Sequence, residues 1–312
     1  MKLIRHLADA AVFANGSALT IGNFDGVHAG HRMVLDALTQ QAKTQGLPTV
    51  VMCFEPQPIE YFRAADAPAR ISTARDKITQ LSQTGVDFLY LVRFDHRLAN
   101  MSAEQFVEML HQRLKIKLLI VGDDFCFGKN RQGNFDYLTA AGKRLGFSVL
   151  KSHSFKIENE RASSTLIRHA LESGELKKAA LYLNRPYTMS GRVMHGDKRG
   201  RELGFPTANI RVKNRKTPLK GVFAVTITLE SGLSYKGVAN VGTRPSIEDT
   251  TAVLLEAHLF DFSGNLYGQR VIISFCEKLR DEKKFNDLNQ LTEQISIDSA
   301  QAKIYFNQTR TA

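Results

Sequence analysis

The fold of the first half of the chain is decided by the stretch Ile21-Gly22-Asn23-Phe24-Asp25-Gly26-Val27-His28-Ala29-Gly30-His31. A short apolar run, Ser17–Ile21, leads into it, and a helix-like stretch near Arg32–Thr44 follows it. A strand, a glycine-containing turn and a helix in this order begin a βαβ unit. The free amides at such a helix start favour phosphate, and glycine lets the backbone come close to it. We therefore predict a parallel sheet with an anion-binding loop at this point.

Outward from this stretch, short apolar runs alternate with amphipathic stretches up to about Leu183. The predicted strands are 17–21, 49–54, 88–94, 117–121 and 148–153. The predicted helices lie near 32–44, 74–84, 103–114, 135–145 and 165–172. This alternation is typical of an α/β fold with a doubly wound, Rossmann-like parallel sheet.

The pattern changes after Asn184-Arg185-Pro186-Tyr187. From there, β-branched and polar residues alternate between glycine turns, and this alternation predicts short strands. The predicted strands are 189–194, 221–228, 234–240, 252–260 and 270–275, and a helix near 288–306 follows them. Short strands without helices between them predict a closed antiparallel β-barrel with a terminal helix. We expect two domains, α/β over residues 1–184 and β over residues 185–312.

Length and composition agree with a two-domain enzyme of the cytoplasm. At 312 residues the chain exceeds the usual size of a single core. Its longest apolar runs, 50–54 and 118–121, are far too short to cross a bilayer, so we expect no membrane partner. The N-terminal MKLIRHLADA lacks the apolar stretch and cleavage site of an export signal. Three cysteines, Cys53, Cys126 and Cys276, form no CxxC pair and are typical of reduced thiols.

A formal net charge of +11 leaves two interpretations open. One is an RNA-binding or regulatory protein, because Lys and Arg neutralise phosphates. The other is a basic surface that receives small phosphorylated ligands. Acids and glycines are mixed among the basic residues of 185–220, and no aromatic stacking series accompanies them. We therefore expect no nucleic-acid partner.

His28 and His31 are the first candidate catalytic residues. Three residues apart at a helix start, they lie on one side, so both imidazoles can donate to the same phosphates. In adenylyl transfer, charge builds on the α-phosphate oxygens and on departing pyrophosphate, and paired donors stabilise it. The alternative is an ordinary polar helix end. A relative of the aminoacyl-tRNA synthetases that share HxGH is also excluded, because no KMSKS-like lysine loop is present.

Two further segments accompany the histidine pair. Gly122–Gly128 follows another predicted strand, and its Asp124 is a candidate for ribose or base contact, or else caps the loop. Ser163-Ser164-Thr165-Leu166-Ile167-Arg168 combines N-cap residues with an arginine one turn later. Hydroxyls, amides and a cation suit triphosphate oxygens, although an ordinary capped helix has the same pattern.

The second candidate site lies in the predicted barrel. Gly191–Asn209 is rich in glycine, which suits a ligand flap, although a glycine-rich hairpin has the same composition. Thr207 and Asn209, two apart in an extended segment, present oxygens to one face and suit a nucleotide-bound Mg²⁺. Glu256 interrupts the apolar pattern of 253–260. It is either an outward-facing residue or the group that accepts a proton from a substrate hydroxyl.

In series and in order, these segments resemble the bacterial bifunctional riboflavin kinase/FMN adenylyltransferases, the prokaryotic FAD synthetase family, over essentially the whole chain. The similar blocks are Gly22–His31, Gly122–Gly133, Ser163–Arg168, Gly191–Asn209, Gly237–Pro245, Glu256 and Leu279–Phe285. HxGH occurs in many nucleotidyltransferases, whereas GRxLGFPTAN beside it is specific. One departure is Ala162, where a larger apolar residue commonly precedes the serine pair.

The resemblance implies two reactions that both use ATP with Mg²⁺. The barrel phosphorylates riboflavin to FMN and leaves ADP, and the first domain joins AMP to FMN, giving FAD and pyrophosphate. The implied catalytic residues are His28, His31, Arg168 and Glu256. The implied nucleotide contacts are Gly22, Asn23, Phe24, Asp25, Gly30, Asp124, Ser163, Ser164, Thr165, Gly196, Lys198, Gly204, Phe205 and Pro206. Thr207 and Asn209 are the implied metal ligands, and Arg280 and Glu282 the implied flavin contacts.

One alternative within this family is a chain in which only the barrel kinase is active. The complete HxGH and SSTxIR segments argue against it. The sequence leaves the oligomeric state open.

Overall fold

The computed structural model describes residues 1–6, 10–122, 124–152, 156–157, 160–195, 206–212, 216–244, 252–285 and 287–309. The chain forms two compact units. The first unit comprises Met1–Ala67 and Lys77–Ala162, and the second comprises Pro68–Asp76 and Ser163–Ala312. The division of activities at residues 184 and 185 stays a prediction, because compactness alone does not assign an activity to a segment.

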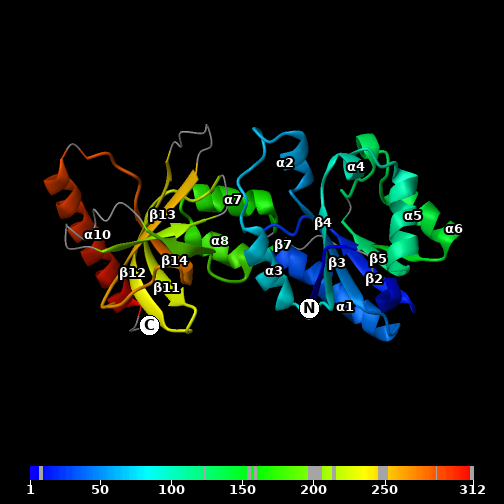
Figure 1. Ribbon diagram of the computed structural model, residues 1–312, viewed down its shortest axis with the longest axis horizontal. Helices are drawn as coiled ribbons and strands as arrows, with labels where there is room; N and C mark the ends of the chain where they lie inside the picture. The colour runs from blue at the N-terminus through cyan, green and yellow to red at the C-terminus, as the bar shows by residue number, and fades with distance from the viewer. Residues whose placement is uncertain are drawn as a thin grey trace. The chain divides into compact units, whose positions relative to one another are not determined.

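A parallel six-stranded sheet with the order β1-β4-β3-β2-β5-β6 forms the first unit, as expected (Figure 1). Its strands are β1 (Lys2–Ile4), β2 (Ser17–Ile21), β3 (Thr49–Glu55), β4 (Phe88–Arg93), β5 (Ile116–Val121) and β6 (Ser148–Lys151). From β2 the chain builds outward through β3 and β4, and it then continues with β5 on the other side of β2. This reversal is a topological switch point, where open α/β sheets bind their ligands at the carboxyl ends of the strands.

Helices cover both faces of this sheet, because alternate strand residues point to opposite sides. Leu19 of β2 packs in the cluster that contains Phe106 of α5 (Ala103–Leu114) and Leu138 of α6 (Phe135–Leu145), whereas its neighbour Ala18 packs with Leu38 of α1 (Ala29–Thr44). The helical elements are η1 (Ala10–Phe13), α1 (Ala29–Thr44), α2 (Pro58–Phe62), α3 (Ala74–Ser82), α4 (His96–Ala99), α5 (Ala103–Leu114), η2 (Lys129–Arg131) and α6 (Phe135–Leu145). A short hairpin, β7 (Lys156–Ile157) and β8 (Glu160–Arg161), was not predicted.

The second unit contains the predicted closed barrel, with strand order β10-β13-β12-β11-β14-β9 and antiparallel pairing. Its strands are β9 (Thr188–Met194), β10 (Thr207–Arg211), β11 (Gly221–Leu229), β12 (Ser234–Arg244), β13 (Ala252–Leu259) and β14 (Arg270–Arg280). The extended segment expected around Thr207 is thus a barrel strand. Helices α7 (Ser164–Glu172) and α8 (Leu176–Leu183) precede the barrel, and α10 (Leu288–Gln308) follows it.

Helix α10 lies against the outside of the barrel (Figure 1). Its Ala302 and Phe306 pack with Ala224 of β11 and with Phe260. Among the described residues, no helix combines the length and apolar character that a membrane crossing requires. Cys53, Cys126 and Cys276 are free thiols, as the sequence predicts.

Candidate active sites

The histidine loop connects β2 to α1 at the switch point. Its backbone reverses sharply: Phe24, Gly26 and Val27 have φ of 47°, 80° and 41°. Two of these are non-glycine residues in the left-handed region, a conformation that costs on the order of 1–3 kcal/mol and gathers at functional sites. Phe24 and Val27 are buried in one apolar cluster, which holds the loop in this conformation.

His28 caps helix α1. Its Nδ1 accepts a hydrogen bond from the backbone N–H of His31 over 3.3 Å, as a serine or aspartate side chain commonly does. The helix therefore begins at Ala29, three residues earlier than predicted, because histidine is not among the usual caps. Because Nδ1 of His28 accepts a hydrogen bond, it carries no proton. The proton of the neutral ring is then on Nε2, which gives His28 one N–H donor.

The two imidazoles are stacked, with ring centroids 3.6 Å apart and an interplanar angle of 21°. His28 is buried, and within the described residues the buried Nδ1 of His31 has no hydrogen-bond partner. Burial, followed by the electrostatic interactions with His28 and Lys77, holds the pKa of His31 well below its ordinary value of 6.5. The pair thus lies at the predicted anion loop with His31 neutral at pH 7.

Gly30 lies where a side chain would be tightly crowded. A Cβ at this position would stand 3.1 Å from the carbonyl oxygen of Ala162 and 3.2 Å from Cε1 of His28. Ala162 is the last residue of the first unit and directly precedes Ser163. The end of the first unit therefore passes beside the histidine loop.

The second predicted loop follows β5, the neighbour of β2 across the switch point. Asp124 is exposed in this loop, and its Oδ1 lies 3.1 Å from where a Cβ of Gly122 would be. The structure thus brings the loops after β2 and β5 to adjacent strand ends, as the sequence predicts.

An aromatic cluster follows the next two strands of the same edge. Phe62, at the end of α2, is 61% exposed, and its ring centroid lies 5.3 Å from that of Tyr61 and 5.6 Å from that of Phe94. Phe94 directly follows β4, and α2 comes shortly after β3. We predicted no role for these rings, although the sequence places them after the ends of predicted strands.

Ser163 caps α7 in the second unit, with its Oγ accepting from the N–H of Leu166 over 3.3 Å. Ser164 and Thr165 form the first turn, and Nε of Arg168 donates to the carbonyl of Ala69 over 2.7 Å. The segment is therefore a capped helix, which fits both interpretations, and its phosphate role stays a prediction. Its amides and hydroxyls remain grouped at one helix start.

The barrel register sets Asn209 and Glu256 directly opposite each other. Asn209 of β10 pairs with Glu256 of β13, and Asn240 of β12 pairs with Glu256 from the other side. Residues opposite each other in an antiparallel ladder share a face, with Cβ atoms about 4.5–5.5 Å apart. Leu255 and Ala257 fill the core, so Glu256 lies half-buried on the other face. Asn240 was missed, because only strand pairing places it beside Glu256.

Thr207 lies one row along the same face, opposite His258. Nδ1 of His258 lies 3.0 Å from the carbonyl oxygen of Pro206. A hollow of about 420 Å³ opens here, lined by Pro206, His258, Leu259, Phe260, Asp261, Phe262, Ser263 and Lys303. An aromatic-lined hollow next to Thr207 suits a planar base. The predicted contacts Gly196, Lys198, Gly204 and Phe205 lie outside the described residues.

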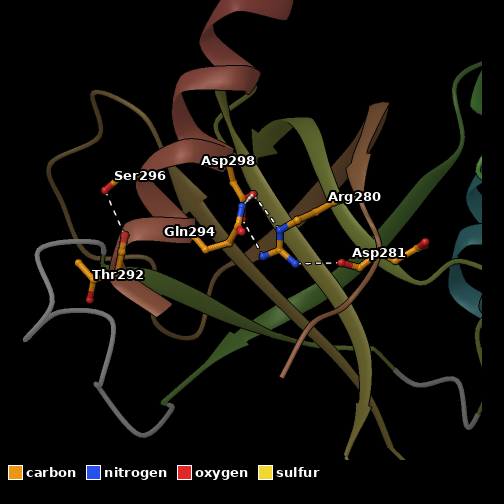
Figure 2. Close-up of polar contacts among 6 residues, drawn as sticks. All are labelled: Arg280, Asp281, Thr292, Gln294, Ser296 and Asp298. Carbon is orange, nitrogen blue, oxygen red and sulfur yellow. Dashed lines mark hydrogen bonds and ion pairs between the residues drawn. The ribbon is translucent and has the colours of Figure 1, made fainter. Parts of the chain in front are cut away.

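Arg280, predicted as a flavin contact, is engaged by α10 (Figure 2). Its Nε and Nη2 donate to the two carboxylate oxygens of Asp298, each over 2.8 Å, and its Nη1 donates to the carbonyl of Asp281 over 2.9 Å. Glu282 is exposed, and its Oε1 occupies the space that a Cβ of Gly242 would need. The flavin roles of Arg280 and Glu282 stay predictions.

Known proteins resemble this chain over nearly its whole length. Residues 11–166 match the family model described as FAD synthetase, and residues 183–306 match the one described as riboflavin kinase. A bifunctional riboflavin kinase/FMN adenylyltransferase of Haemophilus influenzae is 49% identical, over 98% of this chain and 100% of its own length. The chain belongs to this family. The Escherichia coli K12 protein with the same name is 42% identical over 100% of both chains.

Membership in the bifunctional riboflavin kinase/FMN adenylyltransferase family confirms the predicted family, the transferase class and the order of the two halves. The fold also matches a crystal structure described as a macrolide-efflux protein from Streptococcus pneumoniae. That match has a TM-score of 0.78 and 27% identity and covers 96% of this chain and 97% of that one. The likeness concerns the fold, and efflux is not carried over.

Proposed function

We propose that the barrel transfers the γ-phosphoryl group of ATP to riboflavin, giving FMN and ADP, and that the parallel-sheet unit joins AMP from ATP to FMN. The observation that carries this proposal is the register that sets Glu256 opposite Asn209. It sets a carboxylate opposite a side-chain amide on one face, a combination that suits metal-assisted phosphoryl transfer. The two activities are those named for the family.

In the kinase step, Glu256 accepts the proton of the riboflavin hydroxyl while the hydroxyl oxygen attacks the γ-phosphorus of ATP and the bond from that phosphorus to the leaving ADP breaks. Asn240 flanks the same carboxylate from β12 and orients it. The face offers the side-chain oxygens of Thr207 and Asn209, neutral hard ligands of the kind that suit Mg²⁺ carried by a nucleotide. When bound, Mg²⁺ would neutralise negative charge on the phosphates of the nucleotide.

In the adenylyl step, a phosphate oxygen of FMN attacks the α-phosphorus of ATP, and the bond to the leaving pyrophosphate breaks. The Nε2–H of His28, together with His31 and the amides of the loop, stabilises the charge that develops on the phosphate oxygens. Ser164, Thr165 and Arg168 contribute further donors, as the resemblance to the family implies.

The adenine of ATP and the isoalloxazine ring of the flavin are planar, and we expect each to bind an aromatic surface. The hollow beside Pro206 takes the adenine of the kinase nucleotide, because rings and a lysine line it. Phe62, Tyr61 and Phe94 take the isoalloxazine ring of FMN, since exposed rings at the strand-end edge offer stacking area. We place the enzyme in the cytoplasm, with riboflavin, FMN, FAD, ATP, ADP and pyrophosphate as its partners.

The test is chromatography of riboflavin, ATP and Mg²⁺ incubated with the purified full chain, with FMN and FAD followed over time. FMN should appear first, and FAD should follow together with pyrophosphate. A reaction started from FMN should give FAD without riboflavin. Absence of any flavin nucleotide would contradict both halves of the proposal.

A further inference from the structure

Lys77 of α3 is a buried cation in the first unit, with 1% of its surface exposed. Lysine is almost never fully buried unless it is paired, because taking an ammonium out of water is unfavourable. A helical lysine normally lies on the solvated face, so sequence reasoning gave Lys77 no role. Its burial points to a task that offsets this cost.

The ammonium reaches the histidine loop. Nζ of Lys77 donates a hydrogen bond to the carbonyl oxygen of Asn23 over 2.8 Å. In a trans peptide the carbonyl and the following N–H point in opposite directions. Lys77 therefore directs the amide of Phe24 away from the interior of the unit. Asn23 is exposed, so the Asn23–Phe24 peptide lies near the surface of the loop.

The charge of Lys77 also acts on the groups around it. Together with burial and His28, it holds the pKa of His31 low. Burial raises the pKa of the nearby Cys53 thiol to about 11 despite Lys77, so this thiol stays protonated and supplies no negative charge. The carbonyl of Asn23 offers only a partial charge. A polyphosphate on the loop supplies full negative charges, which a buried ammonium favours strongly.

We propose that Lys77 is a positioning residue of the adenylyl-transfer site, which turns the Asn23–Phe24 peptide so that its amide meets the nucleotide and adds a buried positive charge to the phosphate loop. This inference rests on the proposed adenylyl transfer at Gly22–His31. It assigns a function to a residue outside every predicted site.

The first test is Lys77→Met, which nearly keeps the length of the side chain and removes its charge. With FMN, ATP and Mg²⁺, we expect a higher KM for ATP and a fall in kcat/KM of at least about tenfold. Riboflavin phosphorylation by the same preparation should be unchanged, because the barrel belongs to the other unit. Lys43→Met is the matched control, since Lys43 is exposed in the last turn of α1 of the same unit.

A second readout separates this role from a merely structural one. The pKa of His31, followed by NMR, should rise in Lys77→Met, because the variant loses a nearby positive charge. In the wild-type chain, the amide resonance of Phe24 should shift when a non-hydrolysable ATP analogue binds. This measurement needs no variant and stands even where Lys77→Met fails to fold.

Each of three outcomes would overturn the inference. Folded Lys77→Met could form FAD at a rate within about twofold of wild type, or the pKa of His31 could be the same in the variant and the wild type. The third outcome is an amide resonance of Phe24 that does not shift when the ATP analogue binds. Failure of the proposed adenylyl transfer itself would look different, because the wild-type protein would then form no FAD from FMN.

Discussion

Arg280 and Asp298 form a bidentate ion pair between the end of β14 and helix α10 (Figure 2). The side chain of Asp298 is 3% exposed and that of Arg280 15%, and Nε2 of Gln294 adds a hydrogen bond to Asp298 over 3.0 Å. Two parallel N–H···O bonds fix both distance and orientation. The pair therefore fastens the terminal helix to the barrel wall, at the segment that leads to the predicted flavin contact Glu282.

Asp298→Asn should destabilise the barrel by about 3–5 kcal/mol, because removing one partner leaves a buried guanidinium uncompensated. Hydrogen exchange should show the loss in α10 and β14, with the first unit unaffected. Glu293→Gln is the matched control, since Glu293 is an exposed acid of the same helix. Equal protection in Asp298→Asn and Glu293→Gln would mean that the pair contributes nothing to stability.

His31 should make the first unit less stable as the pH falls. Its pKa is lowered on folding, so below the unfolded value of 6.5 the unfolded chain binds a proton that the folded chain does not. Stability is therefore lost as the pH falls through 6.5, and the loss ends below the folded pKa. His31→Gln removes this contribution. Hydrogen exchange of β2 at about pH 8 and about pH 5.5 should show a smaller loss in His31→Gln than in wild type.

Much of the fold could be predicted, because its signals are local. The strand predicted at 17–21 is β2, and the strand predicted at 49–54 ends one residue short of β3. Apolar period and turn residues suffice for such elements. The start of α1 could not be placed, since it depends on a histidine cap that only the folded loop reveals.

The candidate sites needed information that the sequence does not carry locally. Periodicity left the role of Glu256 open, and only the pairing of β10 with β13 reveals that Asn209 lies opposite it. Lys77 was missed because an amphipathic helix pattern does not distinguish a solvated lysine from one that turns inward. The resemblance of a short block assigned Arg280 to flavin binding. Nothing in the sequence indicated that Arg280 pairs with Asp298, which lies 18 residues further along the chain.

His28→Ala should let FMN accumulate while FAD formation falls by about tenfold or more, because the loop loses a donor and α1 loses its cap. Chromatography of a reaction started from riboflavin shows both effects in one run. His96→Ala is the control, since His96 is exposed in the same unit. Unchanged FAD formation would remove His28 from the proposed role.

Gly30→Ala should impair FAD formation without weakening α1. Alanine favours the helix by about 1 kcal/mol over glycine, but its Cβ would press on the carbonyl of Ala162 and on the ring of His28. A small displacement of a catalytic group is enough to slow the reaction by about tenfold or more. Steady-state rates from FMN, together with hydrogen exchange of α1, separate the two effects. A fully active Gly30→Ala would show that the loop tolerates the shift.

Glu256→Gln should reduce riboflavin phosphorylation by about a hundredfold or more, because an amide cannot accept the hydroxyl proton. Conversion of added FMN to FAD should continue at the wild-type rate, since the proposed adenylyl site lies on the parallel sheet. Glu230→Gln, in the exposed turn between β11 and β12, is the matched control. Loss of both activities in Glu256→Gln would instead indicate that the carboxylate holds the barrel together, and its catalytic role would then fall.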